Sequence, residues 1–150
     1  MAIGLAALGL LAFLLGCSGT FAEPPNLERA TKCSLSGSWK NDLNSTMESN
    51  SVSNTGVFIG VYKTAVSGSG KPVPPSPLQG IQHQGLQPTF GFTVSWILTE
   101  STAVFVGQCL VNNSGKDHLK TTWLLREKVG SAANDWGATR VGTDTFYRSE

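Results

Sequence analysis

The chain has 150 residues, of which 14% are charged, and its formal net charge at pH 7 is +1. A chain with so few charges does not favour a partner that binds by electrostatic attraction. We therefore expect no nucleic-acid binding. The length is that of one domain and allows one sizeable hydrophobic core.

The N-terminus carries a short apolar run at residues 3–16, followed by small and polar residues ending in Thr20-Phe21-Ala22. The run is too short to span a bilayer comfortably, and the pattern predicts a secretory signal peptide over residues 1–22. Leu-Leu-Gly-Cys at 14–17 offers an alternative, a bacterial lipoprotein site with a lipid on Cys17. With plain cleavage the mature protein is secreted, extracellular and free of membrane. Residues 23–32, with proline and mixed charge, predict a flexible arm before one domain at 33–150.

The cysteine count becomes even once the signal peptide is removed. Cys33 and Cys109 then remain in an oxidising compartment, which favours a disulfide between them. Two free buried thiols are the alternative. Asn44 and Asn112 begin glycosylation sequons, which matter only in a host that glycosylates.

Stretches of alternating polar and apolar residues, bounded by turn residues, recur about every ten residues along the chain. The turns include Asn54-Thr-Gly56 and Asn113-Ser-Gly115, where Asn and Gly tolerate positive φ. Short connections between eight strands predict an all-β, antiparallel up-and-down barrel, because closure alone removes exposed sheet edges. The predicted strands are 34–42, 49–53 (weak), 57–66, 78–84, 89–98, 101–111, 118–127 and 137–147.

One face of these predicted strands mixes aromatic rings with hydroxyl and amide groups. Asn41, Tyr62, Thr64 and Ser101 share this face with tryptophans at 96 and 123. Unpaired polar groups in an ordinary core cost roughly 1–3 kcal/mol each, whereas a bound ligand satisfies them. An eight-stranded barrel can hold one small ligand, so the pattern favours a ligand cavity. The alternative is that each hydroxyl is satisfied within the protein or points outward.

Six segments of the chain carry motifs that can be compared with known families. They are Cys33-Ser-Leu-Ser-Gly-Ser-Trp39-Lys-Asn41-Asp-Leu43, Gly60-x-Tyr62-x-Thr64-Ala-Val66, Gln87-Pro-Thr-Phe-Gly-Phe-Thr-Val-Ser-Trp96, Phe105-Val-Gly-Gln-Cys109, Lys120-Thr-Thr-Trp123-Leu-Leu-Arg126 and Asp135-Trp136-Gly-Ala-Thr-Arg-Val-Gly142. These motifs resemble the avidin/streptavidin family, and animal avidins most of all. The resemblance runs from about residue 32 to residue 148, and all four tryptophans fall at positions where the family has tryptophan.

The resemblance implies high-affinity, non-covalent binding of biotin inside the barrel, without chemistry. The ureido oxygen of biotin would accept hydrogen bonds from Asn41, Ser45 and Tyr62, and its two N–H groups would donate to Thr64 and Asp144. A carboxylate at Asp144 resembles streptavidin, where avidin has an amide, and a charged acceptor makes the stronger bond. The walls would be formed by Leu43, Val66, Trp96, Leu98, Phe105, Trp123 and Leu125.

The resemblance also implies a carboxylate subsite and an assembly. The loop residues Ser67, Gly68 and Ser69 would hold the valerate carboxylate of biotin from one side, and Thr99 and Ser101 from the other. Trp136 would enter the pocket of a neighbouring subunit in a homo-oligomer, a tetramer in most of the family and a dimer in some members. Two residues depart from avidin: Ala103 replaces a common threonine, and Leu98 replaces an aromatic wall residue.

An enzyme is a weaker hypothesis on this sequence. His83 and His118 lie in polar or turn segments and are expected to be solvated. The sequence shows no metal-ligand spacing, phosphate loop or nucleophile–base pairing. Two further alternatives are a secreted barrel that carries a different small ligand and a structural or interaction scaffold.

Overall fold

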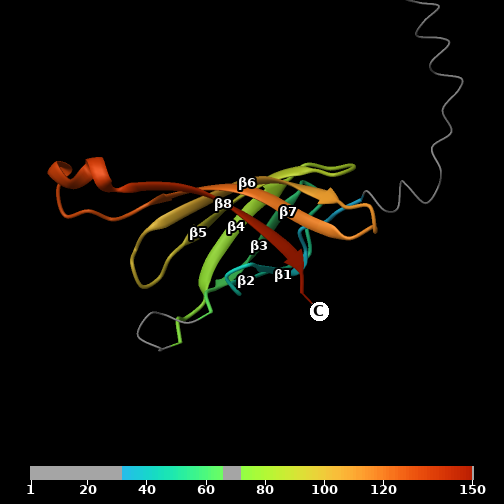
Figure 1. Ribbon diagram of the computed structural model, residues 1–150, viewed down its shortest axis with the longest axis horizontal. Coiled ribbons are helices and arrows are strands. Elements are labelled where there is room, and N and C mark those ends of the chain that lie inside the picture. Colours follow the sequence, from blue (N-terminus) through green and yellow to red (C-terminus); the bar gives the residue numbers. More distant parts are fainter. Residues whose placement is uncertain (1–31, 66–71, 150) are drawn as a thin grey trace, which may run out of the picture.

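The computed structural model describes residues 32–65 and 72–149, which form one closed, antiparallel β-barrel (Figure 1). Each strand pairs with the next along the chain, and β8 pairs with β1 to close the barrel. The predicted fold class is therefore confirmed.

The predicted signal peptide lies outside the described residues, and so does the predicted arm except Lys32, which bridges to Leu86. The elements are β1 (Gly37–Asn41), β2 (Thr46–Ser49), β3 (Val57–Lys63), β4 (Ser76–Gln82), β5 (Thr89–Ser95), β6 (Thr102–Val111), β7 (Asp117–Arg126), the 3₁₀ helix η1 (Ala132–Gly137) and β8 (Thr139–Arg148).

The alternation of side chains along each strand places one face inside the barrel. In β5 the buried residues are Phe90, Phe92 and Val94, while their neighbours face outward or are half-buried. The Phe92 ring stacks on that of Phe105 from β6, with 4.7 Å between centroids. Apolar burial of this kind supplies the main stabilisation of the barrel. Within the described residues there is no helix with the length and apolar character needed to cross a membrane.

Several predicted strand boundaries are wrong. The second strand is β2 (Thr46–Ser49) rather than 49–53. This four-residue strand buries one large apolar side chain, Met47, so its sequence shows no repeating alternation that would locate it. The third and fifth strands end at Lys63 and Ser95, and the first begins only at Gly37, whose φ of +106° interrupts the extended chain. In both predicted turns the positive φ falls on glycine alone, at Gly56 and Gly115.

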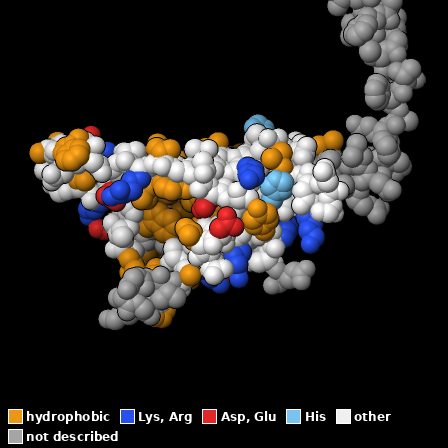
Figure 2. Space-filling view, in the orientation of Figure 1, with side chains coloured by type: hydrophobic (Ala, Val, Ile, Leu, Met, Phe, Trp, Pro, Cys, Tyr) orange, Lys and Arg blue, Asp and Glu red, His pale blue; other side chains and the backbone are white. Residues whose placement is uncertain are grey.

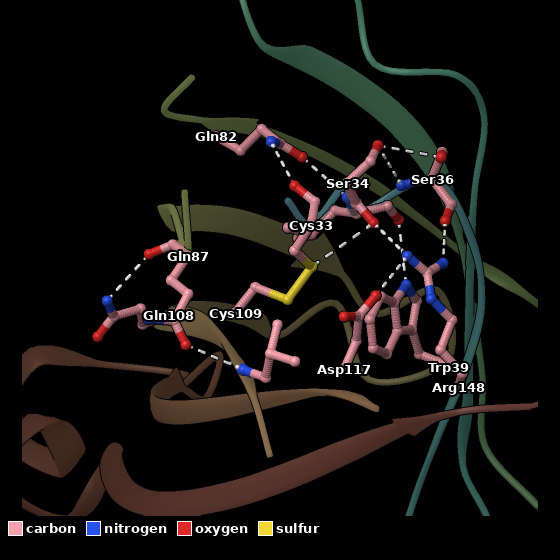
Figure 3. Close-up of a disulfide and its surroundings, with 12 residues drawn as sticks. Cys33, Ser34, Ser36, Trp39, Gln82, Gln87, Gln108, Cys109, Asp117 and Arg148 are labelled. Carbon is pink, nitrogen blue, oxygen red and sulfur yellow. Dashed lines mark hydrogen bonds and ion pairs between the residues drawn. A yellow bond between two sulfur atoms is a disulfide. The ribbon is translucent and has the colours of Figure 1, made fainter. Parts of the chain in front are cut away.

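The barrel end near the start of β1 is closed by a disulfide and an arginine (Figure 3). Cys33 and Cys109 are bonded, with 6.2 Å between their Cα atoms, as the sequence predicted. The guanidinium carbon of Arg148 lies 4.1 Å from the ring centroid of Trp39, and its nitrogens donate to the carbonyls of Ser34 and Ser36. These contacts hold β8 against the segment before β1, so side chains close this end of the barrel.

Candidate functional site

A cavity of about 710 Å³ opens at the opposite end of the barrel, where β1, β3, β5 and β7 end. Figure 2 shows it as an apolar hollow in the face of the molecule. Its volume lies in the usual range for small-molecule sites, about 300–1,000 Å³. The structure places these predicted site residues on its lining: Asn41, Leu43, Ser45, Tyr62, Thr64, Trp96, Leu98, Thr99, Ser101, Phe105, Trp123, Leu125 and Asp144. Val66, Ser67, Gly68 and Ser69 lie outside the described residues.

Asn41 is the centre of the polar cluster of the cavity. Its Oδ1 accepts from the backbone N–H groups of Leu43 and Ser45, at 3.1 and 2.9 Å, in the turn between β1 and β2. These bonds fix the orientation of the side-chain amide. Its Nδ2 therefore points to the other polar groups and donates to Tyr62 Oη at 3.2 Å and Asp144 Oδ2 at 3.0 Å.

Tyr62 is buried at the same place, and its hydroxyl stays protonated. Burial raises the pKa of the Tyr62 phenol far above its usual value, and the nearby Asp144 carboxylate raises it further. Hydrogen bonds with Ser45 and Asn41 offset only part of this effect. The phenol is consequently a neutral O–H donor at neutral pH.

Asp144 supplies the acidic side chain of this cluster. It lies on β8 opposite Thr121 of β7, whose hydroxyl donates to the Asp144 carbonyl at 2.8 Å and holds the backbone there. Burial raises the pKa of the Asp144 carboxyl, the Asn41 hydrogen bond lowers it, and the negative charge of Asp42 raises it. Among the described residues, the Asn41 amide is the side-chain donor to this carboxylate, so its acceptor capacity is only partly used.

Thr64 carries a buried hydroxyl that has no hydrogen-bond partner among the described residues. The residue follows β3 directly and lines the cavity that Asp144 also lines. A buried hydroxyl without a partner costs free energy, and such groups are few in native proteins. Thr64 and Asp144 together offer acceptors that a ligand N–H group would satisfy.

Aromatic rings form the walls around this polar cluster. The rings of Tyr62 and Trp96 meet edge to face at 5.0 Å between centroids, and Tyr62 stacks on Phe105 at 5.8 Å. The indole of Trp123 lies so close to Gly142 of β8 that a Cβ at that position would overlap the ring. Only glycine fits opposite this tryptophan, which keeps the indole against the barrel wall.

The mouth of the cavity is apolar and open. Leu43 and Leu98, both predicted wall residues, line it but are 75% and 62% exposed in the single chain. Beside them, the hydroxyls of Thr99 and Ser101 are hydrogen bonded to each other at 2.5 Å. Large apolar side chains exposed at a cavity mouth indicate a surface that another group covers.

Trp136 lies in η1, beyond the mouth, and does not line the cavity of its own chain. Figure 1 shows η1 standing away from the barrel, at the end of the β7–β8 connection. The side chain is 90% exposed, although an ion pair between Arg126 and Asp135 ties the connection back to β7. In the single chain Trp136 therefore does not pack against the rim of its own barrel.

The sequence reasoning missed several lining residues. Ser76 is almost fully buried and accepts a hydrogen bond from the Ile97 N–H, but it lies before residue 78, where the fourth strand was predicted to begin. Extending the alternation back from Leu78 would have found it, because Ser76 lies on the same face. A second acid, Glu127, also lines the mouth of the cavity. The residues missed are Val73, Ser76, Ile97, Glu127, Lys128 and Thr143.

Comparisons with known proteins agree with this architecture. Residues 29–149 match the model of the avidin family. The chain is 54% identical over 120 residues to avidin-related protein 1 of Gallus gallus and 50% identical over 122 residues to avidin of the same species, and each match covers 79% of this chain and 80% of the relative. The solved structure titled as a biotin binding protein from chicken is similar with a TM-score of 0.73 and 50% identity, covering 79% of this chain and 98% of that one. On this similarity, together with the closed eight-stranded barrel, the chain belongs to the avidin family.

Proposed function

We propose that this chain is a secreted protein that binds biotin tightly and non-covalently in the barrel cavity, with no catalytic step. The family and the chicken biotin binding protein support the identity of the ligand. The single observation that carries the proposal is the buried hydroxyl of Thr64, which has no partner in the described part of the chain and lies on a cavity lined also by the Asp144 carboxylate. A cyclic urea has two N–H groups, and these two acceptors match them.

The donors of the cavity match the remaining polar atom of the urea. In the ligand-free cavity the Asn41 amide donates to Tyr62 Oη and Asp144 Oδ2, and the Tyr62 phenol is hydrogen bonded with Ser45, so the three donor groups lie together. The ureido oxygen of biotin would accept from these three groups. The tryptophan walls would cover the rings and exclude water, which strengthens the buried hydrogen bonds.

We assign two contacts to the mouth of the cavity, one with the valerate tail of biotin and one with a second subunit. Thr99 and Ser101 would donate to the valerate carboxylate, together with Ser67 and Ser69 of the β3–β4 loop. Trp136 of a neighbouring chain would cover the exposed Leu43 and Leu98 in a homotetramer. The outer wall supports assembly, because Val104, Leu124 and Val141 form one exposed row across β6, β7 and β8.

Replacement of Thr64 by valine tests the proposal, since valine keeps the shape and removes the hydroxyl. The ligand-free Thr64→Val protein should be at least as stable as wild type, because an unpaired buried group is lost. Its biotin affinity should fall by roughly 0.5–1.5 kcal/mol, the net value of one neutral hydrogen bond. Thr121→Val is the matched control, because that hydroxyl already has a protein partner and its loss should lower the stability. Unchanged biotin affinity in Thr64→Val would remove Thr64 from the ligand site.

A further inference from the structure

We infer that the ion pair between Lys128 and Glu100 at the cavity mouth selects ligands by the charge of their outward end, with Lys128 favouring a free carboxylate and Glu100 opposing it. The inference rests on the proposed function, since it concerns the tail of a ligand whose head lies deep in the barrel. It adds to that function a selectivity for the charge at the outward end of the ligand.

The position of the pair follows from the strand register. Thr102, the first residue of β6, is opposite Arg126, the last residue of β7. The turn before β6 therefore lies beside the chain that leaves β7. The Nζ atom of Lys128 is 2.7 Å from Glu100 Oε2, which joins these two segments across the rim.

Lys128 is the only positively charged side chain on the described lining of the cavity. The other charged lining residues are Asp144 and Glu127, and Glu127 accepts from Arg140 Nε at 3.0 Å. Among the described residues, Lys128 is therefore the cation that a ligand carboxylate meets as it leaves the barrel. The ammonium group has three donors, and Glu100 occupies one of them in this structure.

Glu100 is held at this place by its backbone. Its φ is +55°, in the left-handed region that non-glycine residues seldom adopt, and its N–H donates to the Trp96 carbonyl at 3.0 Å. The pairing with Lys128 lowers the pKa of the Glu100 carboxyl, so Glu100 is ionised at neutral pH. A carboxylate ligand therefore competes with Glu100 for the ammonium group, whereas a ligand with an uncharged amide end does not.

Both side chains are largely exposed, so the expected effect is modest. An exposed charge pair changes affinity by roughly two- to fivefold. Charges at the rim of a site act mainly on the association rate, and salt screens them.

The test compares biotin with its uncharged primary amide on the mature wild-type protein and on Lys128→Gln and Glu100→Gln. The selectivity is the Kd of the amide divided by the Kd of biotin, with association rates recorded at low and at high salt. We expect the selectivity to fall two- to fivefold in Lys128→Gln and to rise by a similar factor in Glu100→Gln. Both changes should shrink at high salt.

Lys120→Gln is the matched control, because it removes the same charge from β7 on the outside of the barrel, where Lys120 contacts Thr145. Its selectivity should equal that of wild type. Equal selectivity in wild type, Lys128→Gln and Glu100→Gln would overturn the inference while leaving biotin binding in place. A wild-type protein that binds neither probe would overturn the proposed function and this inference together.

Discussion

The side-chain amide of Asn41 joins the β1–β2 turn to Asp144 on β8, with Nδ2 3.0 Å from Asp144 Oδ2. Because its Oδ1 is already bound to the backbone of the turn, the amide cannot rotate without losing two hydrogen bonds. The same contact therefore links β1 to β8, whose backbones close the barrel, and orients the acceptor that we assign to the ligand.

The first prediction concerns the Asp144 carboxylate as a ligand acceptor. Asp144→Ala should weaken biotin binding by roughly 1.5–3 kcal/mol, the value of a hydrogen bond to a charged group. The loss should appear in the dissociation rate, with a nearly unchanged association rate, in surface-based or stopped-flow kinetics. Asp42→Asn is the control, because that exposed carboxylate follows Asn41 in the sequence and acts on Asp144 through its charge alone, without lining the cavity. Wild-type dissociation from Asp144→Ala would place the carboxylate outside the site.

The second prediction is a pH dependence with a defined sign. A ligand N–H requires the ionised form of Asp144, so affinity should fall as pH falls through the pKa of this carboxyl in the free protein. Burial raises that pKa, so the decline should begin nearer to neutrality than for an ordinary carboxyl. The limiting slope is about tenfold in Kd per pH unit for one proton.

Biotin amide is the probe for this measurement, because its tail does not titrate. Asp144→Asn should give a flat profile over the same range, since an amide accepts at every pH. A decline of equal size in Asp144→Asn would assign the titration to another group.

The sequence predicted the inner faces of the barrel well because alternation decides them: Phe92, Phe105 and Trp123 lie inside. It failed at β2, whose single large apolar residue gives no repeat. It also failed at the rim, because charged residues just past a strand end resemble ordinary solvated residues, as Glu127 and Lys128 did. The orientation of the Asn41 amide depends on the fold of the β1–β2 turn, which alternation does not specify.

The third prediction concerns the disulfide. Cys33 and Cys109 are 76 residues apart, and in the chain-entropy model such a bridge stabilises the fold by roughly 4 kcal/mol. The double variant Cys33→Ser with Cys109→Ser should lower the free energy of unfolding by up to that amount in a denaturant titration. It should keep its biotin affinity, because the bridge lies at the closed end of the barrel. Alkylation of both cysteines in denatured, unreduced wild type would contradict the pairing.

The fourth prediction links Trp136 to assembly. Trp136→Lys should increase the biotin dissociation rate and also give a smaller particle in light scattering after gel filtration. The reason is that one exposed indole serves both the subunit contact and the neighbouring cavity. Trp136→Phe, which keeps an aromatic ring, should retain more of both properties. A lysine variant with wild-type size and wild-type dissociation would show that each chain completes its own cavity.

The most direct test of the account is isothermal titration of the purified mature protein with biotin, followed by mass analysis of the released ligand. We expect saturation at one biotin per chain, a negative heat-capacity change from burial of apolar surface, and recovery of chemically unchanged biotin. The absence of saturable binding, or the recovery of a chemically altered ligand, would contradict the account.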